Sequence, residues 1–377
     1  MGVKCMKRSD LIDLLPNDYK ELCWENGAMT RHRGIQNEEE LLMLVLFYAL
    51  GHSLIEVKNY AKIEFDRNIS DVGFMKRFYK CNQWIKSIMS KMMTNEVIQY
   101  PVPEKLKDYK VLAIDASDVQ QKGAVRNLFH LHYAVNLFTL SSEEFKITPQ
   151  EQGETLKNFA LGKNKLVIAD RAYASITGIE YCIEKETDFI LRIKNKAFKL
   201  FDKNGNEVVL SSILKNVNEQ SRDFMLYYRV KKELKPIRFC AVKKTREEIE
   251  IEKKRIQRKE SKNQISLSDD TKFTHNYFFV VTSLGNDFTS EEIINLYRLR
   301  WQVEMVFKRY KSILKLGSIP TKTEKTGEVW LNCKMLIALL IEKIMSKVDF
   351  SPTSNKSEYM EGDENNLRIN LDVFFYS

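Results

Sequence analysis

The chain has 377 residues, of which 60 are lysine or arginine and 51 aspartate or glutamate, for a net charge of +9. Hydrophobic residues make up 44% of it, as in an ordinary globular protein, and the length predicts two or three domains. The excess of basic over acidic residues suits a polyanionic partner, although many basic proteins never bind nucleic acid.

Cysteine spacing and hydropathy exclude several classes of protein. The six cysteines are scattered without a Cys-x2-Cys pair, which argues against a zinc module. With no secretory signal, we expect reduced thiols and a cytoplasmic, nucleoid-associated protein. The longest apolar stretch, residues 41–50, is too short to span a membrane, so no membrane partner is predicted. The chain has no glycine-rich phosphate loop, which disfavours a nucleotide-driven activity.

Residues 1–100 are predicted to form helices, over residues 38–50, 53–61 and 71–91. The last of these carries basic and aromatic residues together: Lys76, Arg77, Lys80, Lys86, Phe78, Tyr79 and Trp84. Two short helices with a basic second member are compatible with a helix-turn-helix that reads DNA. The alternative is a small helical bundle whose aromatic residues form the core.

Prolines near residue 101 end the helical region, and an alternation of strands and helices comes next. Strands are predicted over residues 111–115, 128–137, 144–147, 166–169 and 189–193. Helices are predicted over residues 154–161 and from Ser175 to about residue 185. This order predicts one α/β domain over residues 108–193, completed by residues 277–347.

Residues 194–276 interrupt that domain as an insertion subdomain. They contain strand-like runs over residues 207–210, 224–230 and 236–242, and a charged segment, residues 243–263, that we predict to be a solvated helix. A buried strand over residues 277–284 leads to a helix with Thr289 as the start of a capping box. An amphipathic helix over residues 328–347 precedes a polar tail, residues 348–377, which we predict to be poorly ordered.

Two aspartates end short apolar runs. Asp115 follows residues 111–114, and Asp170 follows residues 166–169. Such runs are typical of buried strands, so both carboxylates are expected at a sheet edge, on rigid backbone and facing solvent. One aspartate there is commonplace, because aspartate often ends strands as a turn residue. Two of them with Glu304 on a later basic helix are a much less common combination and indicate a metal site.

The later helix carries a carboxylate among cations. At about 100° per residue, one polar stripe collects several side chains, and two more flank it. These residues are Tyr297, Arg300, Glu304 and Lys311, flanked by Trp301 and Lys308. An acidic group for a metal and basic groups for phosphate are what phosphodiester chemistry requires. The alternative is a solvated helix with pairs four residues apart, such as Arg300 with Glu304.

These motifs resemble those of DDE transposases from bacterial insertion sequences. Residues 297–311 meet the pattern Tyr-x2-Arg-x3-Glu-x6-Lys, which is similar to the signature of the YREK subgroup. Residues 114–117 (Ile-Asp-Ala-Ser) resemble the first acidic motif of the family, and residues 170–173 (Asp-Arg-Ala-Tyr) resemble the second. Three motifs in the right order make the resemblance specific, and no catalytic position is lost.

The resemblance implies a fold: a ribonuclease H-like catalytic core with a mainly β insertion, preceded by an all-α N-terminal domain that binds DNA ends. In that fold the first and fourth strands lie side by side, which would bring Asp115 and Asp170 together. The insertion would contact DNA ends, with backbone contacts from some of the lysines and arginines in residues 253–258.

The resemblance also implies a chemistry. Three catalytic carboxylates, Asp115, Asp170 and Glu304, would hold two Mg²⁺ ions about 4 Å apart, with Mn²⁺ as a substitute. Seven residues are DNA-binding candidates by resemblance or position: Tyr297, Arg300, Lys311, Trp301, Arg171, Tyr173 and Lys308. Within this set packing is favoured for Trp301, and Arg171 and Tyr173 would orient either Asp170 or the DNA.

The predicted function is cut-and-paste transposition: binding of terminal inverted repeats, two-metal-ion strand cleavage, and strand transfer into target DNA. The partners would be double-stranded DNA and a second copy of the chain, since two ends must be brought together. A metal-dependent nuclease of the same fold that transfers no strand is one alternative. A DNA-binding regulatory derivative is another, disfavoured because all three acids are present.

Four further polar residues are given less weight. Asp118 lies past the predicted end of its strand, so it is a poor substitute for Asp115 as a ligand. His130 and His132 share one face of a predicted strand, but no third ligand is in register, and a structural role is favoured. Glu154 matches a recurrent feature of the family, and its role is left open.

Overall fold

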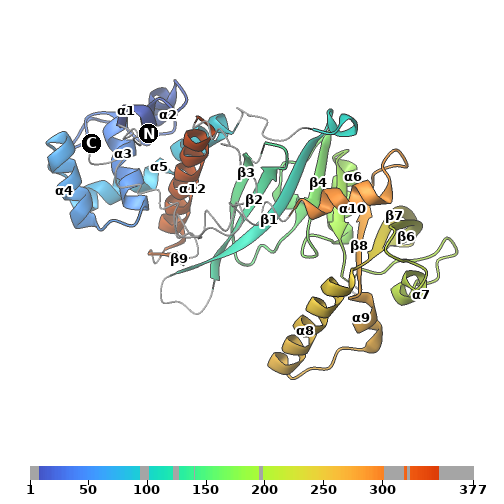
Figure 1. The fold of residues 1–377 in the computed structure, drawn as a ribbon. Helices are drawn as coiled ribbons and strands as arrows, with labels where there is room; N and C mark the ends of the chain where they lie inside the picture. The colour runs from blue at the N-terminus through green and yellow to red at the C-terminus, as the bar shows by residue number, and fades with distance from the viewer. Residues whose placement is uncertain are drawn as a thin grey trace, which may run out of the picture.

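The computed structural model describes residues 8–93, 102–121, 127–139, 141–194, 198–300, 318–320 and 323–347. It is a mixed α/β structure in which helices at one end adjoin a large twisted sheet (Figure 1). The first helices are α1 (Arg8–Ile12), α2 (Tyr19–Glu25), α3 (Glu38–Ala49), α4 (Leu54–Phe65) and α5 (Asp71–Met92). Residues 8–93 contain no strand.

Local sequence explains where these helices begin and which face they bury. Ser53 and Glu56 form a capping box at the start of α4, and the Ser70 hydroxyl accepts from the backbone N–H of Gly73 at the start of α5. Phe78 and Trp84 of α5 are fully buried, and the Trp84 indole donates to the carbonyl of Tyr19 at 2.8 Å. These aromatic residues are therefore core residues, as the helical-bundle alternative expects.

Within the described residues the sheet has nine strands and contains the two carboxylate-bearing segments. Its order is β3-β2-β1-β4-β5-β8-β7-β6, with β9 paired to β1. The strands are β1 (Lys110–Gln121), β2 (Asn127–Asn136), β3 (Ser142–Pro149), β4 (Lys165–Ala169), β5 (Asp188–Arg192), β6 (Arg222–Val230), β7 (Glu233–Lys243), β8 (Tyr277–Thr282) and β9 (Ser318–Ile319). Strands β1, β4 and β5 run parallel to one another, while β2, β3 and β6–β8 pair antiparallel with their neighbours.

Three predicted elements differ from the structure. Strand β1 continues to Gln121 because it pairs with β2 from Leu112 to Gln120, so Asp115 lies within the strand. The predicted helix at residues 154–161 is only a short 3₁₀ turn, η2 (Leu156–Asn158), because Asn158 hydrogen-bonds back to the carbonyl of Gly153. The predicted strand at residues 207–210 is a single bridge from Glu207 to Phe201, followed by helix α7 (Leu210–Leu214).

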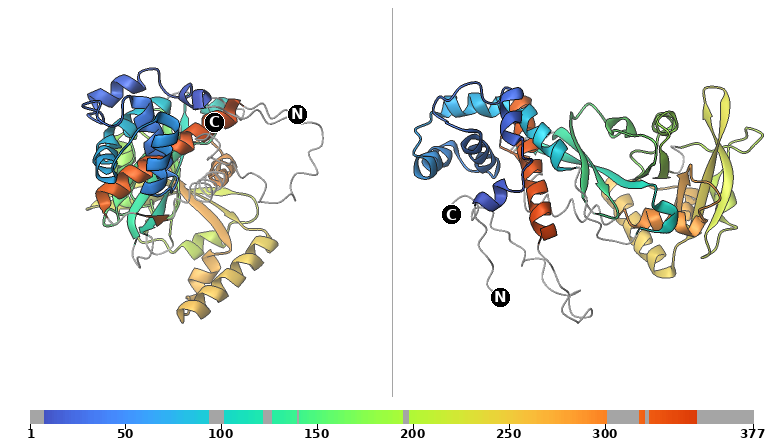
Figure 2. Two further views of the ribbon diagram at one scale, coloured as in Figure 1. Left: turned by 90° about the vertical axis from the view of Figure 1, so that its left-hand side faces the viewer. Right: turned by 90° about the horizontal axis from the view of Figure 1, so that it is seen from above.

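Residues between β5 and β8 extend the same sheet and add an arm of two helices. Strands β6 and β7 join through β8, and α8 (Arg246–Asn263) and α9 (Asp269–Thr274) project away from it (Figures 1 and 2). Ile256 is the one buried residue of α8, which confirms that the charged segment is a solvated helix. Helix α6 (Ile176–Glu184) begins after Ser175, whose hydroxyl caps the backbone N–H of Gly178 as predicted.

Helix α12 (Glu324–Lys347) joins the helical region to the sheet. It contacts α3, α5 and β3, and Figure 1 shows it where the helical region meets the strands. Lys86 of α5 forms an ion pair with Glu328 of α12 at 2.5 Å, so one cation of this basic helix contacts α12. No helix in the described part of the chain has the length and apolarity needed to cross a membrane.

Candidate active site

Asp115 and Asp170 lie next to each other because β1 and β4 are parallel neighbours. Ile114 pairs in register with Ala169, so the residue after each is a carboxylate at the same level of the sheet. Strand β4 ends at Ala169, so β1 has no β4 partner beyond Ile114. The predicted adjacency of these two strands is confirmed.

The Asp115 side chain is largely withdrawn from solvent, with 23% of it exposed. Its Oδ1 accepts from the backbone N–H of Ala116 at 2.9 Å, and its Oδ2 lies 3.5 Å from Nη1 of Arg300. The hydroxyl of Tyr133, the cross-strand neighbour, also hydrogen-bonds to it. Burial raises the pKa of Asp115, opposed by the hydrogen bond from Ala116 and the charge of Arg300, while Asp170 adds to the rise.

Asp170 is held by the turn that follows β4. Its Oδ1 accepts from the backbone N–H of Ala172 at 2.8 Å. Arg171 is half-buried, and its Nε has no hydrogen-bond partner among the described residues. Tyr173 is fully buried, and burial followed by the nearby charges of Glu154, Asp115 and Asp170 raises the pKa of its hydroxyl. The two residues predicted to orient Asp170 or DNA are therefore both beside the carboxylates.

Tyr297 and Arg300 also lie near the two carboxylates. Helix α10 (Ser290–Arg298) begins with the predicted capping box, in which the Thr289 hydroxyl accepts from the backbone N–H of Glu292. The Tyr297 side chain is buried, and the Arg300 guanidinium lies 5.8 Å from the centre of its ring. Four predicted site residues lie outside the described residues: Trp301, Glu304, Lys308 and Lys311.

Arg192 is a site residue that sequence reasoning missed. Leu191 pairs in register with Ala169, so Arg192 ends β5 at the level at which Asp170 follows β4. Its guanidinium lies 5.2 Å from the centre of the Phe278 ring. Burial lowers the pKa of Arg192, and the charges of Arg171 and Arg300 lower it further. Its place at the end of a third parallel strand was the signal that could have identified it.

A further group of charges adjoins these arginines. Lys244, just beyond β7, and His275 both contact Glu252 of α8, at 3.4 Å and 3.0 Å. Burial lowers the pKa of Lys244, offset by Glu252, and the neighbouring charges of Arg192 and Arg171 lower it further. The arginines beside the carboxylate pair follow β4, end β5 and follow α10, and Lys244, just beyond β7, is a further cation near two of them.

Glu154 is a third carboxylate in this neighbourhood. It lies in the loop between β3 and η2, and burial raises its pKa, with further contributions from the charges of Asp170 and Asp115. Among the described residues, no cluster of three histidine, cysteine, aspartate or glutamate side chains is arranged as a metal site. Glu304 is outside those residues, so the predicted set of three acids is described only for Asp115 and Asp170.

The discounted polar residues have other partners. Asp118 is 54% exposed, and its Oδ1 lies 2.8 Å from Nδ1 of His130. His132 is fully buried; its Nε2 lies 2.9 Å from Oγ1 of Thr148 and accepts from the Asn158 amide at 3.2 Å. These contacts support the structural role that was favoured for both histidines.

His132 is expected to make the stability of the fold dependent on pH. Burial lowers its pKa from 6.5 to about 4. A histidine whose pKa is lowered on folding stabilises the fold fully above its unfolded pKa, and this contribution is lost as the pH falls from 6.5 towards 4. We expect wild type to lose about 3 kcal/mol more than His132→Gln over this range. Melting temperatures measured every half pH unit test this, and parallel curves for the two proteins would contradict it.

The donor set around Asp115 and Asp170 fits a hard divalent cation. Two neighbouring carboxylates, one of them largely withdrawn from water, offer oxygen ligands and repel each other, and a bound cation would relieve that repulsion. Arg300 lies 3.5 Å from Asp115 and offsets part of this charge.

Comparisons with known proteins agree with this geometry. Residues 106–340 match the family described as Transposase DDE domain. The transposase for insertion sequence element IS421 from Escherichia coli is 26% identical over 346 residues, covering 88% of this chain and 92% of that protein. The InsL protein for insertion sequence element IS186A, from E. coli strain K12, is also 26% identical, with the same coverage.

A more distant relative is the transposase for insertion sequence element IS231F from Bacillus thuringiensis subsp. israelensis, 24% identical over 48% of this chain and 42% of that protein. The family match covers more than half of the chain and spans both aspartates, β5 and α10. Members of this family are enzymes that act on DNA and depend on divalent metal ions. The chain belongs to the DDE transposase family of bacterial insertion sequences.

Proposed function

We propose that this protein is a cut-and-paste transposase of the YREK subgroup, which binds the terminal inverted repeats of its element, cleaves each end and joins it to target DNA. The observation that carries the proposal is the adjacency of Asp115 and Asp170 at the end of β4, with Arg300 beside them. The family match and the transposase relatives support the same reaction class.

Asp115, Asp170 and Glu304 would be the catalytic residues and the metal ligands. Oxygen-only ligands favour Mg²⁺, with Mn²⁺ as a substitute, and disfavour zinc. Two such ions, when bound, would activate the attacking oxygen and stabilise the leaving 3′-oxygen. Tyr133 donates to Asp115 and the Ala172 N–H to Asp170, so both carboxylates are held in place before any metal binds.

The cations around the carboxylates would hold phosphates of the DNA ends. Arg171 follows β4, Arg192 ends β5 and Arg300 follows α10, and a guanidinium can bind a phosphate through two hydrogen bonds. Tyr297, Trp301, Lys308 and Lys311 remain proposed DNA-binding residues. We propose Tyr173 as a positioning residue for Asp170, because its side chain is fully buried.

The proposed domain organisation is based on the family resemblance. An all-α domain, residues 1–100, would bind DNA ends, and residues 108–193 with 277–347 would form a ribonuclease H-like catalytic domain. Residues 194–276 would be a mainly β insertion, and residues 348–377 a tail. The strand order, with parallel β1, β4 and β5 flanked by antiparallel β2 and β3, supports this assignment. A homodimer would hold two element ends together.

The test is an assay with labelled duplexes that carry the inverted repeats flanking the coding region, in Mg²⁺ or Mn²⁺. We expect nicking at the repeat boundary and joining of the freed 3′-hydroxyl to a target plasmid. Cleavage without joined products would support a nuclease instead. Specific binding of the repeats without cleavage in either metal would indicate a regulatory derivative.

A further inference from the structure

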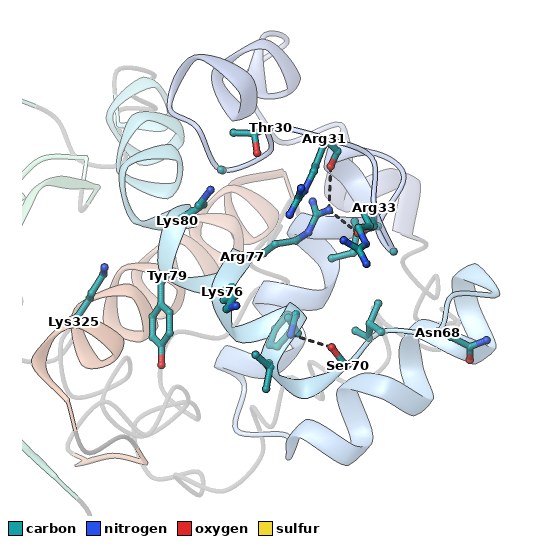
Figure 3. A pocket seen from close by; sticks show the side chains of 17 residues that line it. Thr30, Arg31, Arg33, Asn68, Ser70, Lys76, Arg77, Tyr79, Lys80 and Lys325 are labelled. Carbon is teal, nitrogen blue, oxygen red and sulfur yellow. Dashed lines mark hydrogen bonds between the residues drawn. The ribbon is translucent and has the colours of Figure 1, made fainter.

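A basic pocket lies in the helical region, far along the chain from the carboxylates. It is a cavity of about 770 Å³ between the loop after α2, the start of α5 and the start of α12. The basic pocket is defined by its cationic lining residues, which are Arg31, Arg33, Lys76, Arg77, Lys80 and Lys325. Figure 3 shows these side chains on the loop after α2, on α5 and at the start of α12.

The positive charge of the basic pocket is not neutralised by its own lining. No aspartate or glutamate lines it, and no ion pair involves its six cations within the described ranges. Asp71 at the start of α5 is near, but it is ion-paired with Lys58 at 2.9 Å. Burial lowers the pKa of Arg77, and the charge of Arg31 lowers it further, so these two cations repel each other. An anion would relieve this repulsion.

Arg77 connects two walls of the pocket, α5 and the loop after α2. Its guanidinium donates to the carbonyl oxygens of Arg31 at 3.0 Å and Arg33 at 2.6 Å, as the dashed lines in Figure 3 show. These hydrogen bonds tie the loop that carries Arg31 and Arg33 to α5. Binding a ligand therefore loses little conformational entropy of that loop. On the opposite side, Lys325 lies 5.8 Å from the centre of the Tyr79 ring.

The shape and lining of the pocket indicate which part of a DNA molecule it fits. Base edges are read by an element that protrudes into a groove, whereas this surface is concave. Besides its cations, the pocket is lined by the apolar residues Ile35, Ile69 and Phe74. Phosphates alternate with less polar sugars along a DNA strand, so a lining that combines cations with apolar residues suits the backbone of DNA. The first turn of α5, at Ser70, Val72 and Gly73, adds the positive end of a helix dipole.

We propose that the basic pocket binds the sugar–phosphate backbone of duplex DNA, independently of its sequence. The pocket would add an anchoring contact distant from the carboxylates and would involve both α5 and α12, which connects the helical region to the sheet. This inference rests on the proposed function in that DNA is the substrate. It differs from a helix-turn-helix, in which α5 itself would enter a groove.

The test measures binding of the full-length protein to a repeat duplex and to a shuffled duplex of equal length, without metal, at several salt concentrations. Lys76→Glu/Lys80→Glu alters one wall, and Arg31→Glu/Arg33→Glu alters the other. All four side chains are exposed, and the structural Arg77 is left unchanged. Lys20→Glu/Lys62→Glu is the charge-matched control, with both positions exposed and outside the pocket.

We expect each pocket variant to bind both duplexes about tenfold or more weakly, with a salt dependence shallower by about two phosphate contacts. The control should stay within about twofold of wild type. Pocket variants that bind both duplexes like wild type would overturn the inference, as would loss of binding to the repeat duplex alone, which would indicate base reading. A different result would contradict the proposed function: wild type would bind DNA through the pocket but cleave no repeat duplex in either metal.

Discussion

Replacing Asp115 or Asp170 by asparagine is expected to lower the rate of end cleavage by at least about a thousandfold, with little change in DNA affinity. Asparagine keeps the size of the side chain and the oxygen that accepts from the backbone N–H of Ala116 or Ala172. It removes the negative charge that would hold a divalent cation. Single-turnover cleavage with saturating enzyme measures the effect, and Glu304→Gln should behave in the same way.

Asp118→Asn is the matched control. Asp118 is on the same strand as Asp115 and also carries a carboxylate, but it is exposed and paired with His130. We expect its cleavage rate to stay within about threefold of wild type, because it is no part of the proposed metal site. An equal loss of cleavage rate in Asp118→Asn and Asp115→Asn would mean that the carboxylates act only through the overall negative charge of the strand. That result would contradict the proposed ligand set.

The segments with strong local signals were predictable. Residues 166–169 are uniformly apolar and form a buried strand, and the hydroxyls of Ser175 and Thr289 cap helices where the sequence places them. The adjacency of Asp115 and Asp170 was predicted only through the family resemblance, because strand order in a sheet has no local signature.

Features that depend on tertiary pairing could not be predicted in the same way. Strand β1 continues beyond Asp115 because β2 supplies hydrogen-bond partners as far as Gln120, although residues 116–121 are mostly polar. The segment around Asn158 has helix-forming residues, but the Asn158 side chain is drawn to Gly153 and to the buried His132. These contacts outweigh helix propensity, which is a weak preference of less than about 1 kcal/mol per residue.

The basic pocket shows the same limit for charged residues. Lys76, Arg77, Lys80 and Lys86 were grouped by their place on one helix, yet Lys86 pairs with Glu328 while the other three line the pocket. The sequence does not indicate that Lys325, more than 240 residues away, completes the lining. Charge on a helix is visible in a sequence, but the neighbours that neutralise or concentrate it are visible only in the fold.

Replacing Arg192 by alanine is expected to lower the cleavage rate about a hundredfold, because Arg192 supplies positive charge beside the carboxylates in a half-buried setting. Arg192→Lys should recover part of the rate, since lysine keeps the charge but lacks the second hydrogen bond to phosphate. A merely structural role predicts a different result: both variants would lose thermal stability together with activity. Single-turnover rates and melting temperatures of the two variants separate these cases, and an Arg192→Ala protein that cleaves like wild type would remove Arg192 from the site.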